Sequence, residues 1–183
     1  MSDDAVNIPY VEIRDGFLWN SSKKDIIRDE NNEPEDPFYI VDKLSKISGI
    51  VYIIDINGIE DNSPQLDLLQ ELTEYSKLWV DTSPRRIEDV YDVLIVGAMK
   101  SIINTFYIKK EGIIKIFEDT VNIGVRLRGD DIDYKDIPAL KDIGIDTFVI
   151  EDYDKLNKEL YFLTEKMDID MMSKCRGIIY RGA

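Results

Sequence analysis

The chain has 183 residues and a mass of 21.2 kDa, which is the size of one domain. Its 23 Lys and Arg residues are outnumbered by 37 Asp and Glu residues, for a formal net charge of −14. Such a surface repels phosphate backbones and anionic headgroups, so we expect neither nucleic acid nor a membrane as a partner. The sequence contains no histidine, which excludes histidine-based triads and His–Zn sites. Its one cysteine, Cys175, excludes internal disulfides and suits a cytoplasmic protein.

Short runs of β-branched and other apolar residues predict about seven strands. They lie at 6–13, 50–56, 77–81, 93–97, 121–127, 146–151 and 176–181. Most of them are nearly continuous hydrophobic runs, as expected for strands buried on both faces of a parallel sheet.

Amphipathic stretches between these runs predict helices. Three of them have a capping residue before a proline at the first helical position: Asp36-Pro37, Ser63-Pro64 and Ser83-Pro84. The segments 99–118, 135–143 and 156–173 complete the helical set. Strand followed by helix, about seven times over, predicts one α/β domain that spans residues 1–183.

Two further patterns favour a barrel. The chain repeats itself at a separation of about 100 residues: strand 50–56 is similar to 148–152, 7–14 to 122–128, and 78–84 faintly to 178–183. Polar residues also end most predicted strands, namely Glu12, Asp55, Asp81, Arg126, Glu151 and Arg181. Because functional sites form at the carboxyl ends of parallel strands, a duplicated half-barrel with its site at one end explains both patterns.

The segment 20–36, between the first strand and the first helix, is almost wholly polar. It is either a solvated, partly disordered loop or a mobile lid over the barrel mouth. As a lid it would carry Lys23, Lys24 and Arg28 toward an anion.

Several of these segments together resemble the histidine-biosynthesis barrels, which are the phosphoribosylformimino-aminoimidazole-carboxamide ribotide isomerase and the cyclase subunit of imidazole glycerol phosphate synthase. The similar segments are IPYVEIRDG at 8–16, VYIIDINGI at 51–59, LWVDTSPRRIEDV at 78–90, VLIVGAMKS at 93–101 and FVIEDYDKL at 148–156. The resemblance implies a TIM-type (β/α) barrel of the ribulose-phosphate-binding type, made of two similar halves that each bind one phosphate. Because the chain ends at Arg181-Gly182-Ala183, we expect seven strands with the last βα unit missing.

The resemblance also implies an acid/base pair, one carboxylate after the first strand and one after the fifth. Here the first position is Glu12, and the second is Arg126, which cannot transfer protons at any useful pH. An Amadori-type isomerisation needs both groups, so the replacement argues against isomerase activity. Glu12, Asp55 and Asp154 remain the candidate catalytic residues. We expect Glu12 and Arg126 either to form an ion pair across the mouth or to face apart.

Anion binding is the family property that this sequence retains best. The resemblance implies a phosphate site made by Thr82, Ser83, Arg85, Gly97 and Ala98, with Arg126 as a further ligand residue. Against this, Asp81 stands where the family has a glycine. The alternative is ordinary helix capping by Ser83.

The sequence predicts no cofactor. It contains no glycine-rich nucleotide motif, and although Glu12, Asp55, Asp81 and Glu151 offer oxygen ligands for Mg²⁺ or Ca²⁺, Arg126 and Arg181 share their ring. A sheet of seven strands leaves two unpaired edges, which favours a homo-oligomer.

Three functional hypotheses follow. The first is a divergent relative of the ribotide isomerase that binds a small phosphorylated metabolite, an aldose–ketose isomerase if it is active. The second is a non-catalytic barrel that binds a ligand or a partner protein. The third is an unrelated α/β enzyme with an oxygen-liganded metal.

Overall fold

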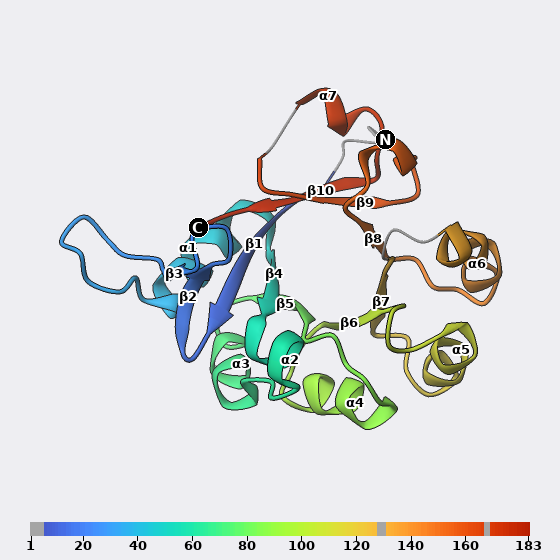
Figure 1. Ribbon diagram of the computed structural model, residues 1–183, viewed down its shortest axis with the longest axis horizontal. Helices are drawn as coiled ribbons and strands as arrows, with labels where there is room; N and C mark the ends of the chain where they lie inside the picture. The colour runs from blue at the N-terminus through green and yellow to red at the C-terminus, as the bar shows by residue number, and fades with distance from the viewer. Residues whose placement is uncertain (1–5, 128–130, 167–168) are drawn as a thin grey trace.

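A computed structural model describes residues 6–127, 131–166 and 169–183. Eight parallel strands form a closed barrel (Figure 1). In order around the barrel they are β1 (Val6–Arg14), β4 (Ile50–Asp55), β5 (Lys77–Asp81), β6 (Lys100–Asn104), β7 (Ile123–Arg126), β8 (Phe148–Ile150), β9 (Tyr161–Thr164) and β10 (Gly177–Arg181). Pairing of β10 with β1 closes the ring, from Val6 opposite Gly177 to Tyr10 opposite Arg181.

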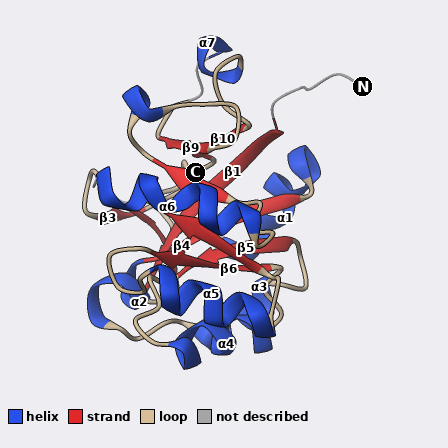
Figure 2. Ribbon diagram, turned by 90° about the vertical axis from the view of Figure 1, so that its right-hand side faces the viewer, coloured by secondary structure: helices blue, strands red, loops and turns tan. Residues whose placement is uncertain are grey.

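Helices lie outside the strands (Figure 2). They are α1 (Pro37–Ser48), α2 (Ile56–Asp61), α3 (Leu66–Leu72), α4 (Ile87–Ile95), α5 (Lys110–Asp119), α6 (Asp131–Asp142) and α7 (Ile169–Met172), with a 3-10 helix η1 (Tyr153–Lys155) between β8 and β9. Two clusters of buried Ile, Leu and Val residues fill the space between helices and strands, and a third cluster rich in aromatic residues fills the barrel interior. In the part of the chain that is described, no helix has the length and apolar character needed to cross a membrane.

The predicted helix start at Asp36-Pro37 is confirmed. The Asp36 side chain accepts a hydrogen bond from the amide of Phe38, Pro37 occupies the first turn, and Gly49 ends the helix in a left-handed conformation. The other two starts are displaced by a few residues, because α3 begins at Leu66 and α4 at Ile87.

One predicted element is wrong. Residues 93–97 belong mainly to α4 and not to a strand, because the helix buries Val90 and Val93 and leaves Ile95 80% exposed. Two predicted helices are correct only in part: the segment 99–118 contains β6 before α5 begins, and the segment 156–173 contains β9 before α7 begins. A short apolar run fits a buried strand and a buried helix turn equally well.

The expectation of seven strands with the last βα unit missing is not confirmed, because β9 is a strand that the apolar runs do not predict. The α/β barrel itself is present. Since β1 and β10 pair with each other, the barrel has no open seam, and the argument from unpaired edges to a homo-oligomer no longer applies.

The polar segment after β1 begins as a β-hairpin. Strand β2 (Phe17–Asn20) pairs antiparallel with β1, and β3 (Asp25–Ile26) pairs with β2. The turn at Asp15 and Gly16 has positive φ at both residues, as tight hairpins require. A bridge between Arg28 and Pro34 continues the hairpin. The segment is therefore folded in this structure, and Ser21 and Ser22 face the barrel mouth.

Two of the three internal similarities agree with a duplicated half-barrel. Strands β1 and β7 are four positions apart around the ring, and so are β4 and β8. The third similarity, of β5 with β10, is displaced by one strand, because the equivalent of β5 is β9.

Candidate functional site

A cavity of about 420 Å³ opens at the carboxyl ends of the strands, and we call it the mouth cavity. Its lining consists of charged, hydroxyl-bearing and apolar residues: Tyr10, Glu12, Ser21, Ser22, Ile54, Ile56, Ile59, Ser83, Asn104, Tyr107, Arg126, Glu151, Leu163, Thr164, Glu165 and Arg181. This is the end of an α/β barrel at which ligand sites form.

Arg126, at the end of β7, is held by two carboxylates. Its Nη1 lies 2.7 Å from Oδ2 of Asp81, and its Nη2 lies 2.9 Å from Oε2 of Glu151. Its Nε is buried and has no hydrogen-bond partner among the described residues. Although burial by itself lowers the pKa of Arg126, the negative charges of Asp81 and Glu151 outweigh it and raise that pKa far above its ordinary value. Arg126 is therefore a permanent cation.

Asp81 is fully buried and binds several groups next to the mouth cavity. Its Oδ1 accepts a hydrogen bond from the amide of Ser83 at 2.9 Å, and its Oδ2 lies 3.4 Å from the Tyr52 hydroxyl. Burial, followed by the charge of Asp81, raises the pKa of Tyr52 well above its usual range. Ser83 adopts a φ of 47°, a left-handed conformation that aims its amide back at Asp81.

Arg181, at the end of β10, repeats this arrangement. Its Nη1 lies 3.0 Å from Oε2 of Glu12, and its Nη2 lies 3.3 Å from Oε1 of Glu165. The hairpin completes the cluster, because the amide of Ser21 donates to Glu12 at 2.8 Å and the Ser22 hydroxyl donates to Glu165.

Each arginine therefore has one buried and one exposed carboxylate partner. The side chains of Asp81 and Glu12 are 0% and 9% exposed, whereas those of Glu151 and Glu165 are 51% and 59% exposed. The buried partner fixes the guanidinium, and the exposed partner occupies the edge that faces solvent.

The predicted ion pair between Glu12 and Arg126 is not formed. Both side chains line the mouth cavity, from the first and fifth strands of the barrel. Glu12 instead forms an ion pair with Arg181 on the adjacent strand, and Arg126 forms an ion pair with Asp81.

The other two candidate catalytic residues lie outside the mouth lining. Asp55 is buried at the start of α2 and accepts hydrogen bonds from the amides of Gly58 and Gln65 and from the Gln65 side chain. Burial raises the pKa of Asp55, and these hydrogen bonds oppose the rise. Asp154 is exposed in η1. Their contacts are those of helix-capping and surface residues.

The predicted phosphate residues are not all brought together. Thr82 and Ser83 follow β5 at the mouth, but Gly97 and Ala98 precede β6 and therefore lie at the opposite end of the barrel. Arg85 donates from Nη2 to the carbonyl of Ile59 at 3.1 Å and lies over the Tyr107 ring.

The helix start after Ser83 is also occupied. The amides of Arg85 and Arg86 both donate to the carboxylate of Asp89, which caps α4 from within. This favours helix capping over a phosphate loop at that position, although the capping residue is Asp89 and not Ser83.

The structure describes no cluster of three or more metal-ligating side chains. Of the four carboxylates predicted as oxygen ligands, Glu12, Asp81 and Glu151 are paired with arginines. Arg126 and Arg181, the two arginines expected to share the ring with these carboxylates, both line the mouth cavity.

Several lining residues were missed by the sequence reading. Leu163, Thr164 and Glu165 belong to β9 or follow it directly, in a segment that the sequence pattern predicts as a helix. The signal was present, because YFLT is rich in β-formers and ends in a charged residue as the other strands do. Ser21 and Ser22 carry no comparable signal, since only the hairpin brings them to the mouth.

A scan against protein-family models and a search of curated proteins both find no match for this chain. These comparisons therefore identify no family for this chain.

Proposed function

We propose that this barrel binds a small hydroxylated anion of the sugar-phosphate class in its mouth cavity, as a divergent relative of the ribotide isomerase that lacks the isomerase reaction. One observation carries the proposal: each of the two arginines at the mouth is fixed by a buried carboxylate and screened by an exposed glutamate.

An anionic ligand can replace those exposed glutamates. Arg126 and Arg181 each keep a buried partner, so neither would be left without a counter-ion when Glu151 or Glu165 swings into solvent. A phosphate or carboxylate would then accept from the vacated guanidinium edge in the same geometry.

The rest of the lining suits a sugar. Ser21, Ser22 and Thr164 offer hydroxyl groups and Asn104 offers an amide, while Ile54 and Leu163 supply apolar contact for carbon faces. A few convergent polar groups on a partly apolar wall are typical of small-molecule sites.

Proton transfer has little support in this cavity. The Amadori rearrangement requires one group to protonate the ring oxygen and another to move a proton from the adjacent carbon. Arg126 occupies the second position as a permanent cation. Oε2 of Glu12 already accepts from Arg181 and from Ser21, so a role as base would require breaking two hydrogen bonds.

The test compares the binding of ribulose 5-phosphate, inorganic phosphate and uncharged ribulose by calorimetry and thermal shift. We expect the sugar phosphate to bind most tightly. Glu151→Gln and Glu165→Gln should each strengthen its binding about fivefold, which corresponds to about 1 kcal/mol of removed repulsion. Glu74→Gln makes the same change of charge at an exposed site remote from the mouth and should leave the affinity unchanged.

Three results would overturn the proposal. Equal affinities for the wild type and both mouth variants would exclude displacement of the glutamates. Turnover of the ribotide substrate above the buffer rate would contradict the lack of isomerase activity. If no phosphorylated compound binds at all, anion recognition at the mouth is rejected.

A further inference from the structure

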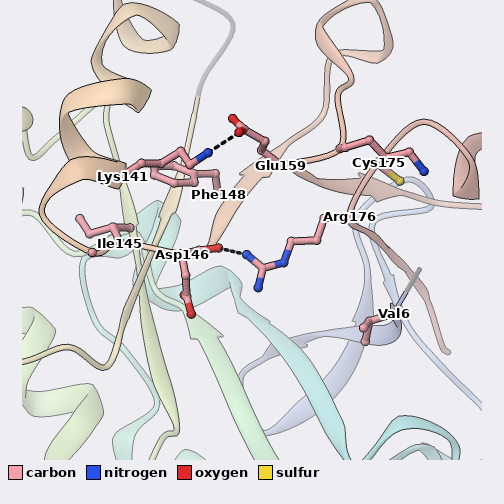
Figure 3. Close-up of a pocket in the computed structure, with 10 residues that line it drawn as sticks. Val6, Lys141, Ile145, Asp146, Phe148, Glu159, Cys175 and Arg176 are labelled. Atoms are coloured by element: carbon pink, nitrogen blue, oxygen red, sulfur yellow. Dashed lines mark hydrogen bonds and ion pairs between the residues drawn. The ribbon is translucent and has the colours of Figure 1, made fainter. Parts of the chain in front are cut away.

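We infer that a second cavity, at the opposite end of the barrel from the mouth, binds a small organic anion with an apolar body. We call it the amino-end cavity, because it lies at the amino ends of β8, β9, β10 and β1 and next to the end of α6. Its volume of about 760 Å³ is within the range of ligand pockets. Figure 3 shows the side chains that surround it.

The acidic side chains of this cavity are already paired. Glu159 forms an ion pair with Lys141. The carboxylate of Asp146 binds Lys100 at 2.9 Å and the Thr147 hydroxyl at 2.7 Å, and in Figure 3 the dashed line to Arg176 starts from the main-chain carbonyl of Asp146. Each carboxylate thus has a lysine as its direct partner.

Two basic side chains remain without a carboxylate partner among the described residues. Arg176 donates from Nη1 to the main-chain carbonyl of Asp146, and its guanidinium lies 5.4 Å from the centre of the Tyr161 ring. These neutral contacts hold the guanidinium in place, and the charge of Arg176 acts on Asp146 only at a distance, without a direct ion pair. Lys158 forms no hydrogen bond or ion pair within the ranges that the structure describes.

The wall beside these cations is apolar. Ile145, Phe148 and Cys175 are almost completely buried and line the same cavity. A ligand that satisfies both parts has one anionic group for Arg176 and Lys158 and an aromatic or aliphatic body for the wall.

The charge of the whole chain restricts the ligand further. A net charge of −14 repels extended polyanions, which would also lie over the acidic surface around the cavity. The local excess of positive charge therefore favours a compact anion that fits inside the cavity. The inference does not depend on the mouth cavity, which lies at the other end of the strands.

The experiment is a titration of isotope-labelled protein with phenyl phosphate, followed by the amide resonances of Ile145, Phe148 and Cys175. Inorganic phosphate and benzyl alcohol separate the two parts of the ligand. We expect saturable shifts with phenyl phosphate and weaker binding of the other two probes. Resonances of Glu12 and Arg181 report on the mouth, so occupancy there is recognised separately.

Lys158→Gln is the decisive variant, because this exposed side chain has no hydrogen bond or ion pair to lose among the described residues. It should weaken phenyl phosphate binding about threefold or more, and Arg176→Gln should weaken it further. Lys43→Gln, an equal change of charge on α1, should have no effect. The inference is overturned if phenyl phosphate produces no saturable shifts at these amides, or if Lys158→Gln binds as tightly as Lys43→Gln.

Discussion

Asp81 holds three groups at once: the Arg126 guanidinium, the amide of Ser83 and the hydroxyl of Tyr52. Asp81 itself is out of contact with water, where an unpaired charge is expensive. The position of Arg126 in the mouth therefore depends on a residue that is not part of the cavity lining.

Replacement of Asp81 by Asn should be strongly destabilising. The substitution keeps the shape of the side chain but leaves the Arg126 cation with only the exposed Glu151 as a counter-ion. Breaking a buried pair in this way typically costs about 3–5 kcal/mol. Urea denaturation followed by circular dichroism measures the change in the free energy of unfolding.

The matched control for this prediction is Glu159→Gln. It also removes the acidic partner of an ion pair, with Lys141, but at a solvent-exposed position, where the cost is about 1 kcal/mol or less. Equal losses of stability in the two variants would show that the Arg126 cluster contributes no more than a surface pair.

At the scale of single residues, the sequence predicts which residues lie at the mouth better than it predicts which of them form ion pairs. The rule that sites form at strand ends placed Glu12, Arg126, Glu151 and Arg181 at the mouth, where the structure also has them. It does not determine which acid pairs with which arginine, because that depends on side-chain reach across a ring whose number of strands the sequence underestimates. The predicted ring of seven strands lacks β9 and, with it, Glu165 as a partner for Arg181.

At the scale of elements, the errors share one physical origin. The run VLIV in α4 and the run YFLT in β9 are both short and apolar, and length alone does not distinguish a buried helix turn from a buried strand. Burial on one helical face resolves the first case, through Val90 and Val93. The second is resolved only by pairing, since β9 lies between β8 and β10.

Barrel closure depends on a glycine at the first position of β10. Gly177 lies opposite Val6 of β1, and a Cβ at this position would come within 2.5 Å of the Val6 carbonyl and 2.8 Å of the Tyr161 ring. Gly177→Ala should therefore separate β10 from β1 and cost about 1–3 kcal/mol. Amide hydrogen exchange should show faster exchange in β1 and β10 than in the wild type, with β4 and β5 less affected.

Gly16→Ala serves as the comparison for closure. It has a positive φ but no neighbouring atom within 4 Å of the added carbon, so it strains the hairpin turn without touching the β1–β10 pairing. Unchanged protection of β1 and β10 in Gly177→Ala would mean that these strands are not closely paired.

At the scale of the whole molecule, the two halves of the barrel place equivalent polar residues four strands apart. Glu12 corresponds to Arg126, and Asp81 corresponds to Glu165. Both arginines belong to the half formed by β7 to β10, and their buried partners, Glu12 and Asp81, belong to the half formed by β1 to β6. The internal sequence similarities predict this repeat for two pairs of strands. The third similarity, of β5 with β10, is displaced by one strand, because the predicted strands do not include β9.

The whole molecule also carries a charge that its fold must tolerate. With a net charge of −14, like charges repel one another over the surface, and the compact state suffers more than the unfolded chain. Salt shortens the range of this repulsion from about 30 Å at 0.01 M to about 8 Å at 0.15 M. Exposed ion pairs also weaken in salt, but they contribute only about 0–1 kcal/mol each.

Added sodium chloride should therefore raise the melting temperature at pH 7, by about 2–4 °C for each 1 kcal/mol of repulsion removed. Differential scanning calorimetry between 0.01 and 0.15 M salt measures the shift. The same series near the sequence pI of about 4.4 is the control, because net repulsion is absent there and the rise should disappear. A melting temperature that falls with salt at pH 7 would show that attractive ion pairs outweigh the net charge in this barrel.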